Sequence, residues 1–505
     1  MHFFEFGDQK MNNRLKLSST LVLLALGANV SAGGNISASV TIEELAAKLD
    51  QISKENAELR QRLNKIENVT NEQTSSIKEV QENQVAVVKA SKFINLLKVV
   101  SFNNKYGYAM LDPNQRIHSK QRLLLENKKA GNLSANSLYL SGAVTGIANA
   151  QKSNTEDKFG WLMRHPTSNN QRTKTSSEAV IHSTQLAFTA NLGDWTSAYM
   201  ELLYSPEQSF GAGTNVAISR NLTQVRRGYV LFGNLNKSPF YASLGKMAIP
   251  FGLTDSVSPF TGSTVWHTFG GLANGLNTGY TKDGLNINVM FVQGGAQFRS
   301  ANVPVDKSST PSKLNNFAMD ANYTFNVTAD TDFLVGASYI KGSAYCQSFP
   351  VTHFSACNER NAAYDTYVRL DGKNWQLKAE VAQTVDKWPG SFNPTIPEHG
   401  ATKVTSFDVG GKYNSKLLGI PTDYSLEFSR FDAGPSGAPW EKQDQWVLGL
   451  ASFITPSTKL FAEYIHTAGY APLNFVSGGN LGDGVSWSTQ DAKSDVLTIG
   501  ANVAF

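Results

Sequence analysis

Residues Leu497–Phe505, which read LTIGANVAF, decide the fold of this chain. The odd-numbered residues of this stretch are all apolar, whereas the even-numbered ones include Thr498 and Asn502. Such alternation is typical of a β-strand whose two faces meet different surroundings. Because the stretch also ends in an aromatic residue, it indicates a strand of a transmembrane β-barrel built in a bacterial outer membrane.

The same alternation recurs in about sixteen stretches from Ser137 to the end of the chain. Short links between them, such as 192–194 and 282–284, alternate with long ones. Glycine and aspartate in the short links permit the positive φ values of tight hairpins. This rhythm predicts an all-β transmembrane antiparallel barrel over residues 137–505, with both termini and the short turns in the periplasm. The predicted strands are 137–148, 183–191, 195–204, 222–233, 240–249, 274–281, 285–293, 316–325, 332–342, 363–371, 375–384, 404–413, 424–432, 443–453, 458–467 and 495–505.

The composition agrees with one large barrel rather than several soluble domains. Charged residues make up 17% of the chain, and glycines number 41. Beyond residue 26, no apolar run reaches the roughly 20 residues that a spanning helix needs. The formal net charge of +4 is too small to indicate a nucleic-acid partner and fits only a mild preference for anionic solutes.

The first 32 residues have the layout of a secretory signal peptide. Basic residues, including Arg14 and Lys16, precede the apolar run 17–26, and Val30-Ser31-Ala32 supplies a small-residue cleavage site. Met11 begins a more ordinary signal than Met1 does, so the start codon stays open between the two.

Residues 33–90 carry a heptad pattern that predicts an α-helical coiled coil in the periplasm. Polar Asn56 interrupts the apolar seam, and a polar residue at such a position fixes the register of the paired helices at some cost in stability. We therefore expect a homo-oligomer, for which trimeric porins offer one precedent; a lone amphipathic helix is the alternative. The seam positions are Leu45, Leu49, Ile52, Asn56, Leu59, Leu63, Ile66, Thr70, Gln73, Ile77, Val80, Gln84 and Val87.

Residues 91–136 lie between the coiled coil and the barrel and include the basic stretch 118–129. They form either a periplasmic linker or a small plug in the lumen.

Charged residues on the predicted strands should face the lumen, because Arg or Lys at the lipid midplane costs about 2–4 kcal/mol. A barrel of this size encloses an aqueous channel, so passage of a solute is the expected function. Arg226 and Arg227 are adjacent, so at least one of them should point inward or lie at a rim. The candidate ligand contacts are Lys246, Lys378, Lys412 and Arg226, and general lumen polarity is the alternative reading for each. Glu201, Asp320, Glu380, Glu427 and Glu463 are expected to be lumenal as well.

The third long link, residues 250–273, is the place where general porins fold a loop inward as a constriction. It carries several aromatic side chains, among them Phe251, Phe260 and Trp266. These could line a path for a bulky solute or pack against the inner wall.

The two cysteines, Cys346 and Cys357, lie in one predicted long loop. In an oxidising envelope compartment, a disulfide between them is the expected state, with two free thiols as the alternative. No catalytic, metal-binding or cofactor-binding motif is found: neither HExxH nor GxSxG occurs, and the glycine-rich 478–484 is only a single weak match to a calcium repeat. We expect no enzymatic activity and no cofactor.

Residues 245–253, which read GKMAIPFGL, resemble a strand-end motif of phosphate-selective-type porins. The order of the parts, with Tyr106–Pro113 and the opening strand Leu138–Leu140, resembles the LbtU-type siderophore porin family over residues 40–505. This resemblance implies uptake of a ferric siderophore, or of another small iron chelate, without TonB-type energy coupling. An anion-selective or general diffusion porin is the first alternative, and a structural or adhesive barrel is the second.

Overall fold

The computed structural model describes residues 47, 50–51, 53–66, 100–154, 174–206, 221–294, 313–346, 360–388, 399–438, 440–469 and 491–505. The chain divides into two compact units, Met1–Lys92 and Phe93–Phe505. The predicted signal peptide lies outside the described residues.

In the first unit, residues 53–66 are helical. Three seam positions of the predicted coiled coil, Leu59, Leu63 and Ile66, are more than half exposed in the single chain. In a coiled coil, side chains at such positions pack against the partner helix, and the coiled coil stays a prediction. Among the described residues, no helix has the length and apolarity to cross a membrane.

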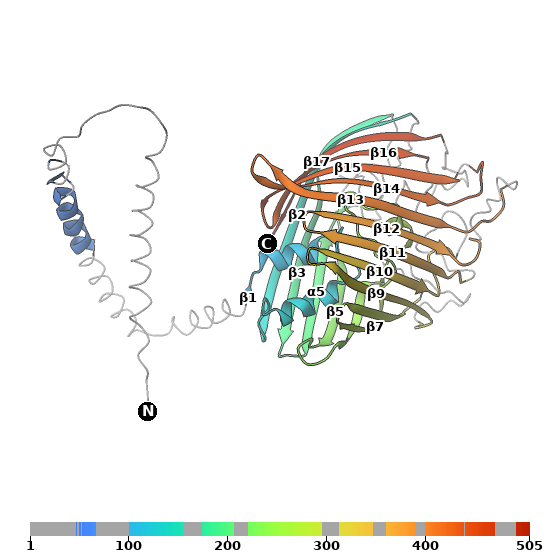
Figure 1. Ribbon diagram of the computed structural model, residues 1–505, viewed down its shortest axis with the longest axis horizontal. Coiled ribbons are helices and arrows are strands. Elements are labelled where there is room, and N and C mark those ends of the chain that lie inside the picture. Colours follow the sequence, from blue (N-terminus) through green and yellow to red (C-terminus); the bar gives the residue numbers. More distant parts are fainter. Residues whose placement is uncertain are drawn as a thin grey trace. The chain divides into compact units, whose positions relative to one another are not determined.

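The second unit is a closed barrel of sixteen antiparallel strands, which confirms the predicted fold (Figure 1). Each strand pairs with its neighbours in the chain, and the last strand closes on the first. A two-residue strand, β1 (Val100–Ser101), adds a short parallel pairing to β2. The barrel strands are β2 (Ser137–Ser153), β3 (Thr175–Leu192), β4 (Thr196–Tyr204), β5 (Thr223–Gly233), β6 (Phe240–Ala248), β7 (Leu272–Lys282), β8 (Leu285–Val292), β9 (Asn316–Thr328), β10 (Thr331–Ile340), β11 (Ala363–Gly372), β12 (Trp375–Thr384), β13 (Thr405–Leu417), β14 (Ile420–Asp432), β15 (Lys442–Thr455), β16 (Thr458–Ala468) and β17 (Lys493–Ala504).

The two faces of the strands differ as the alternation predicts. On β12, Leu377 and Val381 are 50% and 39% exposed, whereas Lys378 and Glu380 are buried inside the barrel. The apolar side chains therefore form the lipid-facing surface, and the charged ones lie in the lumen.

The carboxyl terminus closes the barrel as expected. The backbone N–H of Phe505 donates to the carbonyl of Gly142 at 2.9 Å, and that of Gly142 donates back at 3.0 Å. A Cβ at Gly142 would lie 2.3 Å from the Phe505 ring. A side chain at position 142 would therefore displace the terminal aromatic ring.

Two helices between the first unit and β2 pack inside the barrel: α4 (Asn104–Leu111) and α5 (Lys120–Lys129). The side chain of Asn103 accepts a hydrogen bond from the Tyr106 N–H and caps α4. Leu124 and Leu125 of α5 are almost completely buried, and each contributes about 1.5–3 kcal/mol of apolar burial. We refer to residues 102–135 as the plug; α5 is visible beside β3 and β5 in Figure 1.

The plug is attached to the wall on the β3–β6 side. The Tyr106 hydroxyl lies 2.9 Å from the Thr189 hydroxyl of β3. Leu125 packs so closely on Gly233 of β5 that a Cβ there would lie 3.1 Å from its methyl carbon. The lumen at this end is therefore filled by protein.

Candidate permeation site in the lumen

The link between β6 and β7, residues 249–271, folds into the barrel and follows the inner wall. It reaches β10 through Gly252, whose N–H donates to the Ser338 hydroxyl at 2.8 Å. It reaches β16 through Pro259, whose carbonyl accepts from the Lys459 amine at 2.7 Å. We call this segment the inner loop; it contains the short helix α6 (Thr264–Phe269). The predicted inward fold of this link is thus observed.

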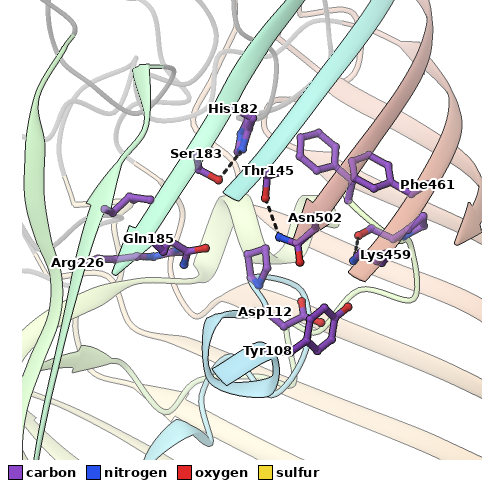
Figure 2. A pocket seen from close by; sticks show the side chains of 14 residues that line it. Tyr108, Asp112, Thr145, His182, Ser183, Gln185, Arg226, Lys459, Phe461 and Asn502 are labelled. Carbon is purple, nitrogen blue, oxygen red and sulfur yellow. Dashed lines mark hydrogen bonds between the residues drawn. The ribbon is translucent and has the colours of Figure 1, made fainter. Parts of the chain in front are cut away.

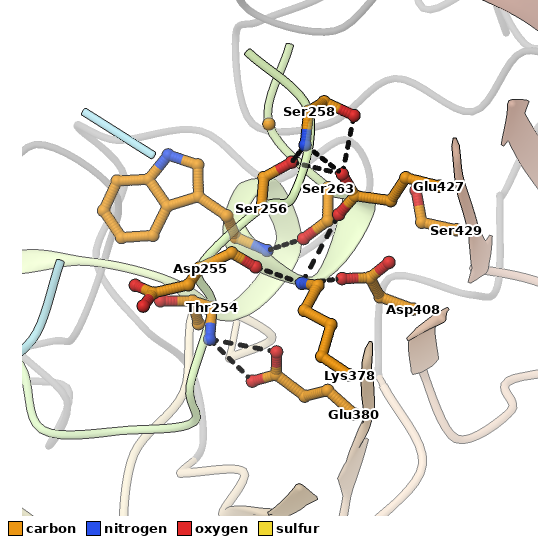
Figure 3. Close-up of polar contacts among 12 residues, drawn as sticks. Thr254, Asp255, Ser256, Ser258, Ser263, Lys378, Glu380, Asp408, Glu427 and Ser429 are labelled. Carbon is orange, nitrogen blue, oxygen red and sulfur yellow. Dashed lines mark hydrogen bonds and ion pairs between the residues drawn. The ribbon is translucent and has the colours of Figure 1, made fainter. Parts of the chain in front are cut away.

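Three wall carboxylates hold the inner loop by its backbone, and two of them, Glu380 and Glu427, are labelled in Figure 3. Both oxygens of Glu380 accept from the Thr254 N–H at 2.9 Å, although Thr254 has a left-handed backbone with φ of 52°. Glu427 accepts from the Ser258 N–H at 3.0 Å, and Glu463 accepts from the Phe260 N–H at 2.7 Å. Charge-assisted hydrogen bonds of this kind are roughly twice as strong as neutral ones, so these glutamates fix the loop.

Lys378 is part of the same anchor. It is 3% exposed and forms ion pairs with Asp408 and, at 3.4 Å, with Glu427. Its amine also donates to the carbonyl of Asp255 in the inner loop (Figure 3). Lys378 is lumenal as predicted, but it lies beneath the loop rather than on the surface that a solute meets.

Lys412 and Lys246 occupy opposite faces of the wall. Lys412 pairs in register with the buried Ser425 and lies 3.9 Å from Asp423, which places it in the lumen. Lys246 pairs with Gly228 and lies on the same face as Leu244, which is 59% exposed.

The lumenal position predicted for Lys246 is therefore wrong. Lys246 stands two residues before the end of β6, and its amine donates to the Val225 carbonyl at 2.9 Å. The cost of a charge on the lipid face falls to about 0–1 kcal/mol away from the midplane. The midplane cost that motivated the prediction does not apply there.

Arg226 and Arg227 both point inward because the ladder is irregular between them. Arg227 pairs with Glu201, whereas the next residue of β4 pairs with Val225, so Arg226 is bulged out of register. The guanidinium groups lie 3.6 Å (Arg226) and 2.8 Å (Arg227) from Glu201. A β-bulge re-aims a side chain, and here it turns a second arginine into the lumen.

The plug and the inner loop meet in the lumen through hydrogen bonds that we call the plug–loop bridge. The amide of Asn114 donates to the Ser258 carbonyl at 2.9 Å, and the Ser256 N–H donates to the Asn114 carbonyl at 2.9 Å. The Gln115 amide donates to the Ser256 carbonyl at 2.5 Å. Nearby, the Ile117 N–H donates to Asp255 at 3.1 Å.

His118 extends this bridge. Its Nδ1–H donates to the Gly252 carbonyl at 3.0 Å, and its Nε2 accepts from the Thr254 hydroxyl at 3.3 Å. Burial lowers the pKa of His118 to about 4, which keeps the imidazole neutral near pH 7.

Lys120 stabilises the plug itself. Its amine donates to the carbonyls of Ala109, Asp112 and Gln115 at 2.6, 3.0 and 3.0 Å. Burial lowers the pKa of Lys120 to about 7. These carbonyls at and beyond the C-terminal end of α4 supply the negative ends of dipoles that a buried ammonium needs.

Two polar cavities flank the bridge. Cavity A, of about 20 Å³, is large enough for about one water molecule. Arg226 and Lys459 line it from the wall and Asp112 from the plug (Figure 2). Other residues around it are Tyr108, Pro113, Thr145, His182, Ser183, Gln185, Leu203, Pro259, Phe260, Phe461 and Asn502.

Cavity B, of about 280 Å³, lies between the plug and the wall strands β8–β11. Plug residues Arg116 and Arg122 face it together with Arg369 of β11. Acidic groups line it as well, namely Glu126, Asp255 and Asp320. The lumen therefore contains cavities lined by charges of both signs.

The arginines of cavity B were not among the predicted contacts. Arg369 shares one face of β11 with Asp365 and Tyr367, and this pattern could have identified it as a lumenal residue. Arg116 and Arg122 belong to the segment for which the sequence left linker and plug open, so their position depended on the docking of the plug.

Cys346 is buried and disulfide-bonded. Cys357, the other cysteine of the chain, lies outside the described residues, so the pairing of the two remains a prediction. In the described part of the chain, no group of three or more His, Cys, Asp or Glu side chains is placed to hold a metal ion.

Comparison with known proteins leaves the solute open. No family model matches the chain. A UPF0422 protein of Coxiella burnetii is 23% identical over 296 residues, which are 57% of this chain and 58% of that relative. The chain thus spans little more than half of that protein.

Several solved outer-membrane channels are similar in fold. DcaP of Acinetobacter baumannii has a TM-score of 0.45 at 14% identity and covers 73% of this chain and 97% of its own. An anion-selective porin from Comamonas acidovorans has a TM-score of 0.43 at 15% identity, covering 73% and 99%. OprB of Pseudomonas putida has a TM-score of 0.45 at 11% identity, covering 72% and 94%.

Proposed function

We propose that this protein is a passive outer-membrane channel that admits a ferric siderophore or another small iron chelate without TonB-type energy coupling. The closed barrel with a plug and an inner loop that leave two polar cavities carries the proposal. The iron comes from the resemblance of the chain to the LbtU-type siderophore porins.

The size of the plug supports passage without energy coupling. Outer-membrane receptors that do depend on energy coupling have about 22 strands and a plugged lumen. Here two helices of 8 and 10 residues fill only part of a sixteen-stranded barrel. The plug meets the inner loop through a small number of hydrogen bonds rather than through a domain-sized interface.

The cationic groups along the lumen support an anionic solute. Arg226 and Lys459 line cavity A, and Arg116, Arg122 and Arg369 line cavity B. Electrostatic interactions in a confined channel are stronger than in bulk water, so these groups would raise the local concentration of a negatively charged chelate.

The size of the cavities sets a condition on this function. Pockets for drug-sized ligands have volumes of about 300–1,000 Å³, and cavity B has about 280 Å³. A ferric chelate of that size class therefore requires the plug to shift away from the inner loop, which breaks the plug–loop bridge.

The test is uptake of radioactive iron from a ferric siderophore in a strain that lacks this gene, with the energy-coupling system intact and then disabled. We expect the deletion to lower iron accumulation in both backgrounds and the gene to restore it. Normal iron accumulation in the deletion strain, with slower entry of phosphate or of small sugars, would favour the other channel function.

That second candidate is an anion-selective or general diffusion porin. The observation in its favour is that cavity B, as it stands, fits a small solute without any movement of the plug. Liposomes that contain the purified protein separate the two: a general porin passes phosphate and sugars of similar size at similar rates, and passage falls steeply with size. A structural or adhesive barrel would pass none of these solutes at a significant rate.

A further inference from the structure

Cavity B has hydrogen-bond donors that lack partners. Arg122 lies on α5 and is 19% exposed, and its Nε is 3.3 Å from Glu126. Among the described residues, this buried Nε has no hydrogen-bond partner, although Arg122 lines the cavity. A guanidinium that is mostly shielded from water and only partly paired favours an additional acceptor.

Asn288 supplies a second donor from the opposite side. It lies on β8, and its amide oxygen accepts from the Tyr241 hydroxyl at 2.7 Å. Within the part of the chain that the structure describes, its amide nitrogen makes no hydrogen bond. Arg122 and Asn288 therefore bring donors to the same cavity from the plug and from the wall.

The acceptors of the cavity, in contrast, are already engaged. Glu126 is paired with both Arg116, at 2.7 Å, and Arg122. Asp320 accepts hydrogen bonds from the side chains of Ser338, Tyr367 and Asn322 at 2.7, 2.7 and 2.9 Å.

Asp255 is engaged in the same way. It accepts from the Ile117 N–H at 3.1 Å and lies 3.9 Å from the Arg369 guanidinium. The spare hydrogen-bonding capacity of cavity B is thus on the donor side, even though its lining carries charges of both signs.

We propose that cavity B is a carboxylate-binding site, in which Arg122 and Asn288 contact the carboxylate directly and Arg369 contributes charge from the wall. The inference deepens the proposed function and rests on it for its place on the solute path. A guanidinium presents parallel N–H groups that match the two oxygens of a carboxylate, which an ammonium does not. With about 280 Å³, the cavity holds a small polycarboxylate or one carboxylate arm of a larger chelate.

The test is the block of ionic current through the purified channel in planar bilayers, with citrate as the probe and sorbitol as a neutral polyol with the same number of carbon atoms. We expect citrate to block at concentrations at which sorbitol does not. Arg122→Gln should weaken the citrate block roughly tenfold or more, because it removes a charge-assisted contact. Asn288→Ala should weaken it by a smaller factor.

Lys129→Gln is the matched control. It removes the same charge from the same helix at an exposed position that does not line cavity B. Arg122→Lys adds a second comparison, since it retains the charge but loses the parallel N–H groups, and its block should be intermediate. Each variant is first shown to migrate as a compact barrel in unheated gels.

The proposal is overturned if sorbitol blocks as well as citrate, or if Lys129→Gln weakens the citrate block as much as Arg122→Gln. No iron is present in this assay. A citrate block that is lost in Arg122→Gln would therefore support the carboxylate site even if iron accumulation proved independent of the gene. Failure of the carboxylate site and failure of the proposed iron uptake can thus be distinguished.

Discussion

Asn114 and Ser258, 144 residues apart in the chain, are joined in the lumen by a hydrogen bond of 2.9 Å from the amide of one to the carbonyl of the other. Neither residue belongs to the barrel wall. The hydrogen bond therefore joins two segments that are inserted into the lumen, each of which is separately attached to the wall.

Breaking the plug–loop bridge should widen the channel. The double change Asn114→Ala and Gln115→Ala removes two side-chain donors to the inner loop. We expect a higher single-channel conductance and faster entry of solutes larger than cavity B, measured in bilayers and liposomes. Asn132→Ala, at an exposed position of the plug, should leave both unchanged. Equal conductance in all three proteins would show that the bridge does not limit passage.

Acid should also loosen the bridge, through His118. Because its pKa is lowered from 6.5 to about 4 when the plug is docked, the undocked state binds more protons between these values. The contribution to docking is complete above pH 6.5 and is lost as the pH falls through 4, by roughly 3 kcal/mol in all. Asp255 and Arg227, the charged groups that face the ring, act on its pKa in opposite directions.

We therefore expect conductance to rise as the pH falls from 6.5 to 4. Other lumenal carboxyl groups also titrate in acid, so the readout is the difference between the wild type and His118→Asn, which retains a donor and an acceptor but does not titrate. Parallel pH profiles for the two proteins would contradict the assignment to His118.

Replacing Lys378 should cost stability rather than selectivity. Lys378→Met leaves Asp408 and Glu427 buried without their cation, and the loss of one partner from a buried ion cluster typically costs about 3–5 kcal/mol. Lys412→Met removes a partly exposed lysine 3.9 Å from its carboxylate and should cost less than about 1 kcal/mol. The check is the temperature at which each barrel loses its compact form in gels, and similar values for both variants would argue against the anchoring role.

Closure of the barrel should depend on the small size of residue 142. Gly142→Ala places a methyl group against the Phe505 ring, whereas the matched change Gly146→Ala on the same strand meets only the Val180 carbonyl, at 4.0 Å. We expect a lower folded fraction for Gly142→Ala alone, measured after refolding into detergent. Adding Phe505→Leu, a smaller side chain, should partly restore it.

Deleting residues 33–90 should dissociate the oligomer while leaving the barrel folded. The seam residues Leu59, Leu63 and Ile66 are more than half exposed in the single chain, and a coiled coil would bury them between subunits. The mass of the detergent-solubilised protein, measured by light scattering before and after the deletion, provides the check. An unchanged mass would mean that the barrel itself holds the subunits together.

The strands could be located from the sequence because lipid and water impose opposite demands on alternate residues. Every barrel strand overlaps its predicted range, and the Phe505 closure was expected from the last stretch alone. The argument from charge failed at Lys246, since the cost of a charge on the lipid face depends on its depth in the membrane, which the sequence does not give.

The function of the lumenal charges could not be predicted in the same way. Whether Lys378 meets a solute or an inner loop depends on a contact with Asp255, 123 residues away, and no periodicity encodes that distance. Arg226 turns inward through a local slip in the ladder, which one extra residue produces without any change in composition. The arginines of the plug acquire a role only when the plug docks.

The attachment of the inner loop has a consequence for how such a channel changes over time. Glu380, Glu427 and Glu463 each accept from main-chain N–H groups, which every residue except proline provides. Hydroxyl groups of Ser258 and Thr261 also donate to Glu427 and Glu463. Loop side chains that do not touch these glutamates can therefore be exchanged with little effect on the attachment. Natural selection or protein design could thus change the solute preference of this barrel through substitutions of such loop side chains alone.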